Sequence, residues 1–156
     1  MSIAEKLTII AENEQKVYEA GKQSQYDLFW DTYQENGKRT NCTHMFAGRG
    51  WRPEMIKPKY DIKPTDAYMM FYHNYNPFDL VELLKDIVLD FSNCTNLQYA
   101  FGASSISRLG VIDCSKATQM HTAFSTSTII TIEELISSAT TPFHTNTFNG
   151  ATGLIN

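Results

Sequence analysis

A segment that recurs after 23 residues constrains the fold of this chain more than any other feature of its sequence. Residues 90–101, DFSNCTNLQYAF, return as residues 113–124, DCSKATQMHTAF. Asp, Ser, Thr, a Leu or Met and an Ala-Phe pair occupy the same positions in both copies. Identity at that many fixed positions, with a period of this size, is typical of a solenoid, in which successive coils of the chain stack on one another.

More degenerate copies extend the repeat in both directions. Each is anchored by a Thr, five intervening residues and a Phe, as in Thr40–Phe46, Thr65–Phe71, Thr95–Phe101 and Thr118–Phe124. A fifth copy runs from Ala139-Thr140 to Phe148 and has two extra residues. We expect Phe46, Phe71, Phe101, Phe124 and Phe148 to stack as an internal column. We expect Thr40, Thr65, Thr95 and Thr118 to hydrogen-bond the backbone of the turns.

Short β-prone runs precede the anchors, and each would contribute one strand to a parallel stack. They comprise residues 60–62, 88–91, 110–113 and 129–132. The longest step, 30 residues from Phe71 to Phe101, contains residues 77–86, which we predict to be a short inserted helix. Residues 37–156 are therefore predicted to form one repeat domain of about five coils without a C-terminal cap.

The N-terminal segment, residues 1–36, is predicted to be helical. Ser2 and Glu5 form a capping box before a helix of about residues 3–20, whose Ile3, Leu7, Ile10 and Val17 share one face. We expect a break at Gly21 and a second helical piece over about 23–35, ended by Asn36-Gly37. Two interpretations stay open. The aromatic side chains of the second piece cap the open end of the solenoid, or the first helix is a short coiled-coil or docking segment.

The two central copies resemble the BspA-type leucine-rich repeats and the related mycoplasma-type surface-protein repeats. The matching positions are Asp90, Ser92, Thr95, Leu97 and Phe101, and Asp113, Ser115, Thr118, Met120 and Phe124. The resemblance covers roughly residues 39–156. It implies an α+β fold, namely an irregular right-handed leucine-rich-repeat solenoid with short parallel strands, and a role in adhesion and surface binding rather than catalysis. The beginning of the chain, SIAEKLT followed by KVYEAGK, resembles that of repeat proteins of gut bacteria and their phages.

Composition narrows the partners and the location. The formal net charge of -4 gives no general attraction for nucleic acid or for anionic membranes. No apolar run approaches the ~18 residues of a membrane span, so we expect no membrane insertion. The start lacks the pattern of a secretion signal, which favours a cytoplasmic or virion-associated protein. The odd number of cysteines, Cys42, Cys94 and Cys114, predicts buried free thiols rather than a disulfide framework.

The candidate chemistry is sparse. His44, His73, His121 and His144 do not have metal-ligand spacing, so we predict no metal and no cofactor. Asp90 and Asp113, one repeat apart, would suit the carboxylate pair of a glycan-acting enzyme, but the repeat alone accounts for both. The candidate binding residues are Trp51, Tyr68, Tyr72, Tyr75 and Tyr99, which would form an exposed aromatic strip for a sugar ring or a protein surface. The alternative is that most of them fill the core and its flanks.

These features predict a non-enzymatic repeat module for protein or surface recognition and assembly, as a structural or host-recognition component of a phage or prophage virion. Its partners would be a protein or a cell-surface glycan, with self-association or another partner covering the open C-terminal end. One alternative is a fragment of a bacterial cell-surface adhesin. The other is the glycan-acting enzyme.

Overall fold

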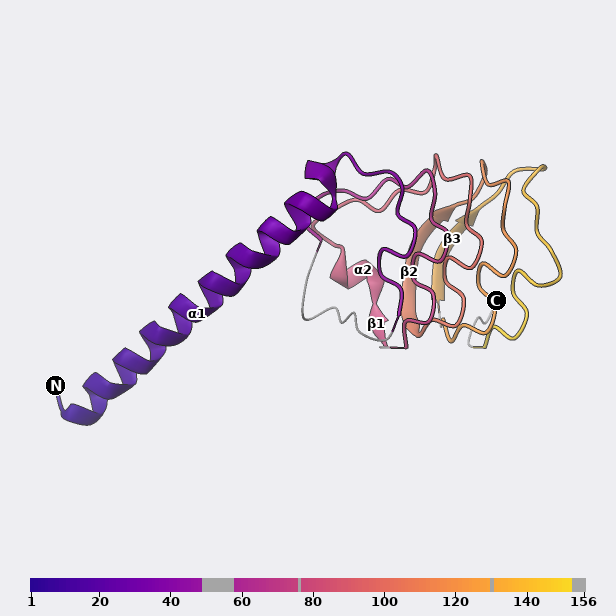
Figure 1. Ribbon diagram of the computed structural model, residues 1–156. Coiled ribbons are helices and arrows are strands. Elements are labelled where there is room, and N and C mark those ends of the chain that lie inside the picture. Colours follow the sequence, from indigo (N-terminus) through magenta and orange to yellow (C-terminus); the bar gives the residue numbers. More distant parts are fainter. Residues whose placement is uncertain (49–57, 76, 130, 153–156) are drawn as a thin grey trace.

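The computed structural model describes residues 1–48, 58–75, 77–129 and 131–152, with the side chains of 22–30 and 32 outside the description. It is a mixed α/β fold in which a long N-terminal helix leads into stacked turns of chain and a small parallel sheet (Figure 1). The elements are α1 (Ile3–Tyr33), the 3-10 helix η1 (Glu35–Gly37), β1 (Phe78–Asp79), α2 (Leu80–Leu83), β2 (Ile106–Asp113) and β3 (Thr131–Ile136).

Helix α1 is continuous, and the predicted break at Gly21 is wrong. A glycine in a helix interior costs about 1 kcal/mol relative to alanine, which is too little to end a helix flanked by good helix formers such as Ala20 and Lys22. The predicted start is confirmed, because Ser2 and Glu5 exchange side-chain and backbone hydrogen bonds. The predicted stop is close to the observed one, since Asn36 and Gly37 have φ angles of 53° and 84° just beyond α1.

The sheet has the order β1-β2-β3, and both strand pairs are parallel. Of the four predicted strands, residues 110–113 lie in β2, which begins earlier, at Ile106. The prediction for 129–132 is displaced, because β3 begins at Thr131 and runs on to Ile136. Runs 60–62 and 88–91 are not strands in the sheet. They are joined to each other by one isolated parallel bridge, between Ile62 and Leu89, and by a hydrogen bond from the Val88 N–H to the Asp61 carboxylate at 2.9 Å.

The inserted segment differs from the predicted helix over residues 77–86. It begins with the two-residue strand β1 and continues as the four-residue helix α2. The side chain of Asp79 accepts a hydrogen bond from the Glu82 N–H at 3.1 Å and so caps α2. Phe78 pairs with Ile106 in the sheet, so the start of this segment forms a strand although its local sequence favours a helix.

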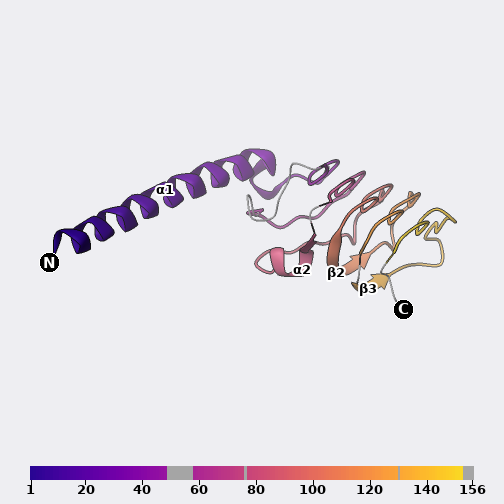
Figure 2. The same ribbon diagram turned by 90° about the horizontal axis from the view of Figure 1, so that it is seen from below.

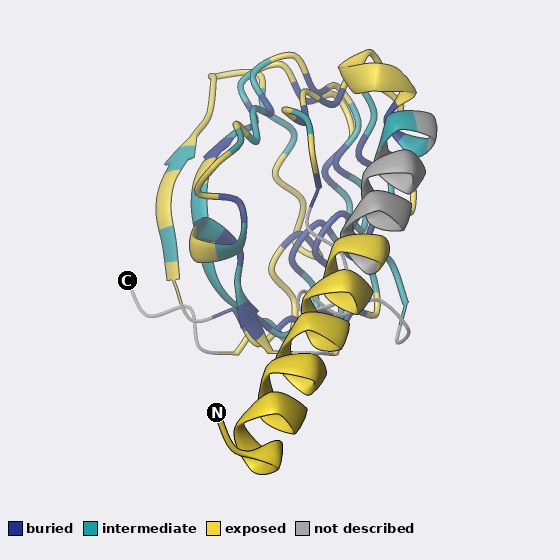
Figure 3. Ribbon diagram, turned by 90° about the vertical axis from the view of Figure 1, so that its left-hand side faces the viewer, coloured by how far each residue is buried: buried dark blue, intermediate teal, exposed yellow. Residues whose placement is uncertain are grey.

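On the side of the body away from the sheet, the stacked turns carry the repeat anchors (Figures 2 and 3). Single parallel bridges join Asn41 to Asp66, Asp66 to Asn96 and Asn96 to Gln119. The backbone hydrogen bonds between turns repeat in the same register. The N–H of each of the first four anchor phenylalanines donates to the carbonyl group of the residue just before the next anchor Phe. The four acceptors are the carbonyl groups of Met70, Ala100, Ala123 and Thr147, at 2.7–2.8 Å. Successive turns are thus hydrogen-bonded neighbours.

The predicted phenylalanine column is confirmed. The rings of Phe46, Phe71, Phe101, Phe124 and Phe148 follow one another with centroid distances of 5.0, 5.4, 5.3 and 5.1 Å. The last two pairs are nearly parallel, with interplanar angles of 5° and 2°. The first four rings are at most 1% exposed, whereas Phe148, at the end of the column, is 38% exposed. The column is the interior of the body.

The predicted threonine hydrogen bonds are also present, in a more regular form than expected. The hydroxyl of Thr65 donates to the Thr40 carbonyl, Thr95 to Thr65 and Thr118 to Thr95, at 3.4, 3.2 and 3.2 Å. The fifth copy does not continue this line. There Thr141, rather than Thr140, reaches back one turn, and its hydroxyl donates to the Cys114 carbonyl at 3.2 Å. The two extra residues shift the register of the last turn.

The C-terminal end of α1 is fixed to the body by Gln34. This side chain is only 2% exposed, accepts the N–H groups of Lys59 and Tyr60 at 3.2 and 3.1 Å, and donates to the Tyr60 carbonyl at 3.1 Å. Asp31 adds an ion pair with Lys59 at 2.8 Å. From this attachment α1 projects away from the body, so the N-terminus and the C-terminal turn lie at opposite ends of the molecule (Figure 1).

Candidate functional site

Two left-handed positions shape each of the first four turns around its anchor Phe. One lies two residues before the Phe, at His44, Met69, Tyr99 and Thr122, with φ of 53–57°. The other lies two residues after it, at Gly48, His73, Ala103 and Thr126. A left-handed conformation costs a non-glycine residue roughly 1–2 kcal/mol, so the fold must stabilise it. The hydrogen bonds between turns do so; for example, Tyr99 N–H donates to the His121 carbonyl at 3.2 Å.

Aromatic side chains from different turns lie in one line, and two of them, His44 and Tyr99, occupy such left-handed positions. The ring centroids of His44 and Tyr68 are 5.7 Å apart, and those of Tyr68 and Tyr99 are 6.3 Å apart. The line continues from Tyr99 to His121 and from His121 to His144, at 6.2 Å each. Side chains spread over 101 positions of the sequence are therefore joined by ring contacts across all five turns.

A second row lies beside the first. The ring of Tyr72 meets Tyr99 edge to face at 5.5 Å and stacks on His73 at 3.9 Å, and His73 is 5.6 Å from Tyr75. We refer to both rows together as the aromatic ridge. Its members are His44, Tyr68, Tyr72, His73, Tyr75, Tyr99, His121 and His144.

The aromatic ridge is open to solvent along its length. His44, His73 and His144 are exposed, and Tyr75 is 43% exposed. The other members are half-buried. Of the tyrosines of the predicted strip, Tyr75 is exposed, whereas Tyr68, Tyr72 and Tyr99 are half-buried at the flank of the core.

Four of the five predicted binding residues, Tyr68, Tyr72, Tyr75 and Tyr99, belong to the aromatic ridge, and Trp51 lies outside the described residues. The histidines were not predicted to line up, yet all four are members. The signal that could have found them is that each lies within four positions of an anchor Phe. His44 and His121 lie two and three positions before it, and His73 lies two positions after it.

The aromatic ridge carries no formal charge. The described residues two and three positions before, and one and two positions after, the first four anchor phenylalanines include no Lys, Arg, Asp or Glu. They are aromatic rings, small residues and hydrogen-bonding groups such as Gln98, Ser125 and Thr126. Such a surface offers ring faces together with hydroxyl and amide groups, without the electrostatic preference of a charged site.

The predicted carboxylate pair serves the backbone. Asp90 accepts the Ser92 N–H at 2.8 Å, and Asp113 accepts the Ser115 N–H at 2.9 Å, the same turn bond one repeat apart. The hydrogen bonds from the Ser92 backbone and side chain hold the pKa of Asp90 below its ordinary value. A general acid for glycoside hydrolysis needs a raised pKa, so Asp90 is poorly suited to that role.

The cysteines are buried free thiols, as predicted. Burial raises the pKa of Cys42 to about 11 and that of Cys94 to about 12, which keeps both thiols protonated and unreactive at neutral pH. Within the described ranges, no group of three or more His, Cys, Asp or Glu side chains is arranged to hold a metal ion. No helix in the same part of the chain has the length and apolar character needed to cross a membrane.

Comparison with known proteins adds no relative to this geometry: no family model, no curated protein and no solved structure matches the chain significantly.

Proposed function

We propose that the chain is a non-enzymatic recognition module that binds neutral glycans through the aromatic ridge. The observation that carries the proposal is the unbroken line of ring contacts from His44 to His144, built from every turn of the repeat. In this proposal the body is a short right-handed solenoid of the BspA-like leucine-rich-repeat type. Stacked repeats of this kind present one continuous surface, and such surfaces typically serve recognition.

The chemistry of the aromatic ridge favours a glycan over a protein. A sugar ring has apolar C–H faces, which pack on aromatic rings, and hydroxyl groups, which need hydrogen-bond partners. The aromatic ridge provides the rings together with hydrogen-bonding groups, and Gln98 beside it provides an amide. Protein interfaces combine aromatic residues with a charged rim that steers the partner. The positions around the anchor phenylalanines lack such charges, so a neutral oligosaccharide fits better.

Two features support a role without catalysis. The turn hydrogen bonds at Asp90 and Asp113 account for both carboxylates, and the low pKa of Asp90 is unsuited to a general acid. The thiols of Cys42 and Cys94 are buried with raised pKa values, which makes them poor nucleophiles. A host-recognition component of a virion and a cell-surface adhesin would both use such a surface. We favour the virion component, with the adhesin as the second candidate.

The proposal is tested by screening the full chain against an array of neutral oligosaccharides and measuring the affinity of any hit by calorimetry. Replacing exposed ridge residues in His73→Ala and Tyr75→Ala should each weaken binding about tenfold or more, as expected for contact aromatics. Val111→Ala is the matched control, because Val111 is similarly exposed, at 47%, but lies on β2. Equal losses in all three variants, or no neutral oligosaccharide bound on the array, would contradict the proposal.

A further inference from the structure

Helix α1 presents an apolar stripe that nothing in the body covers. Every residue from 1 to 21 is exposed (Figure 3). Ile3, Leu7, Ile10 and Val17 are 78, 60, 52 and 74% exposed. The hydrogen bonds that fix α1 to the body lie at its other end, at Asp31 and Gln34. The stripe is therefore held out in solution on a helix of 31 residues.

The spacing of the stripe indicates what covers it. Residues 3, 7, 10, 14, 17 and 21 follow one another in alternating steps of four and three, the heptad spacing of a coiled coil. This spacing keeps a seam facing a second helix of the same kind along its whole length. A hollow on the surface of α1, lined by Ile10, Asn13, Glu14, Val17 and Tyr18, includes the four positions that form the hole for a partner's side chain.

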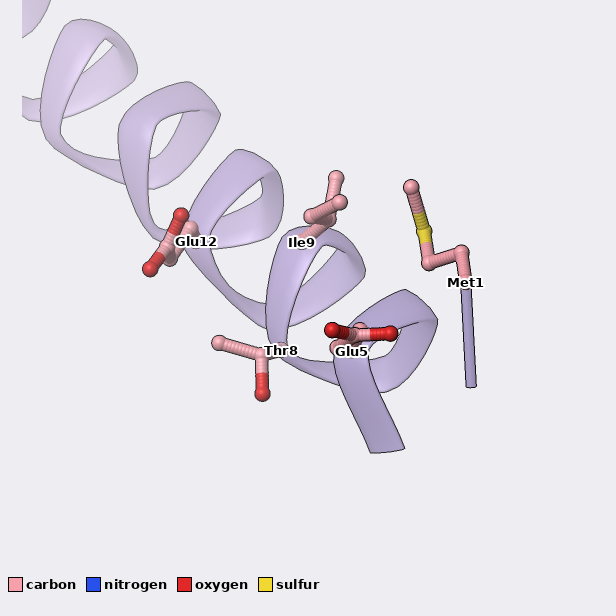
Figure 4. A pocket seen from close by; sticks show the side chains of 5 residues that line it. All are labelled: Met1, Glu5, Thr8, Ile9 and Glu12. Atoms are coloured by element: carbon pink, nitrogen blue, oxygen red, sulfur yellow. The ribbon is translucent and has the colours of Figure 1, made fainter. Parts of the chain in front are cut away.

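The opposite face of α1 has a different character. The hollow there is lined by Met1, Glu5, Thr8, Ile9 and Glu12, so two carboxylates lie among its apolar residues (Figure 4). Glu5 also takes part in the capping box with Ser2 at the start of the helix. Among the described side chains of α1, the seam through residues 3–17 is the more apolar of these two faces.

We propose that α1 forms a parallel, in-register bundle with the α1 helices of other copies of this chain. Parallel alignment places each of the four apolar seam residues against its own copies, and leaves Glu14 and Gly21 in the two weak layers. The antiparallel register that overlaps residues 3–21 would place Ile3 against Gly21 and Ile10 against Glu14. The parallel arrangement therefore buries more apolar surface against apolar surface.

The seam residues also bear on the number of helices. Leu7 occupies the first core position of the heptad, and Ile3 and Ile10 occupy the second. Leu at the first position with Ile at the second favours three or four helices over two. The bundle goes beyond the proposed glycan binding and stands without it. It would gather several aromatic ridges at one end of a common stalk, so weak contacts with a repetitive surface would add up.

The mass of the full chain in solution, measured by sedimentation equilibrium, tests the bundle. We expect an oligomer, with three or four chains as the favoured number, that dissociates at least tenfold more readily in Ile10→Asp. Glu14→Leu should tighten the association about tenfold or more, because it replaces a charged layer with an apolar one. Glu12→Leu makes the same chemical change on the opposite face and should leave the association unchanged. A monomeric wild-type chain, or equal effects of Glu12→Leu and Glu14→Leu, would overturn the proposal.

Disulfide trapping tests the orientation. Ile3→Cys should form a cross-linked species in the oxidised full chain, whereas Thr8→Cys, on the outer face, should not. The three native cysteines are 0% exposed and should not interfere. Cross-linking only between Ile3→Cys and Gly21→Cys chains in a mixture would show antiparallel packing and would overturn the parallel arrangement. The affinity of a single aromatic ridge for a glycan should not change in any of these variants. The test of the bundle is therefore independent of the proposed function.

Discussion

The ring of Tyr72 lies directly against the backbone of Gly102, one turn further along the chain. A Cβ atom at residue 102 would come within 3.2 Å of the Tyr72 Cδ2 atom and within 3.4 Å of the Thr122 carbonyl oxygen. The absence of a side chain at Gly102 therefore gives Tyr72 its place in the aromatic ridge. The packed interior and the exposed ridge are coupled at this contact, since Gly102 directly follows Phe101 of the column.

Gly102→Ala should displace Tyr72 and destabilise the fold by about 1–3 kcal/mol, the usual cost of overpacking. The free energy of unfolding in urea measures the loss. Gly110→Ala is the matched control, because its Cβ would meet the Val81 side chain at an ordinary 3.5 Å. Equal stability of the two variants would show that Tyr72 can move away without cost.

Phe101→Ala should cost about 3–5 kcal/mol, because it opens a cavity in the middle of the column. Phe148→Ala should cost clearly less, since Phe148 stacks on Phe124 at the end of the column and is 38% exposed. Urea denaturation of the two variants compares them. A loss at Phe148 as large as that at Phe101 would contradict the idea that the column ends there.

Gln34→Leu should destabilise the attachment of α1. It leaves the N–H groups of Lys59 and Tyr60 and the Tyr60 carbonyl without their side-chain partner, at about 1–3 kcal/mol for each group left unpaired. Hydrogen exchange at Tyr60 and the unfolding free energy would report the change. Gln15→Leu, on the exposed part of α1, is the control and should stay within about 0.5 kcal/mol of the wild type. Protection at Tyr60 that survives Gln34→Leu would refute the assigned role.

Asp90 makes stability depend on pH in the acid range. Its folded-state pKa is lowered by the hydrogen bonds from Ser92, so its contribution is present above the unfolded-state pKa of about 4. That contribution is lost as the pH falls through the lower, folded-state value. Asp90→Asn keeps an oxygen acceptor for Ser92 and removes the titration. Its stability should therefore fall less steeply than that of the wild type as the pH decreases below about 4. Parallel pH profiles for both proteins would contradict this assignment.

The sequence could predict the Phe and Thr columns because both are carried by residue identity at a fixed spacing. Each Phe needs only the ring of the next turn, and each Thr needs only the carbonyl of the previous one, so the repeat itself contains the contacts. The continuity of α1 through Gly21 was missed because one unfavourable residue does not outweigh the flanking turns of helix. Treating a single glycine as a helix break overestimates the free-energy cost of that residue.

The strand pairing of the sheet and the alignment of the histidines could not be predicted from the repeat. Residues 60–62 are as β-prone as 110–113, but pairing depends on which neighbouring turn lies alongside, and only Ile62 finds a partner there. The histidines occupy different positions relative to their anchor Phe, so no single register aligns them. Their rings join the aromatic ridge through ring contacts with residues of the same or the neighbouring turn, as His44 does with Tyr68 and His121 with Tyr99.

The most direct test of the central claim is the NMR chemical-shift map of the full chain titrated with a neutral oligosaccharide that it binds. Perturbations should concentrate on the aromatic ridge, from His44 through Tyr99 to His144, and should leave the exposed residues of β3 unchanged. Perturbations centred on β2 and β3, with the ridge tyrosines and histidines unaffected, would contradict the account.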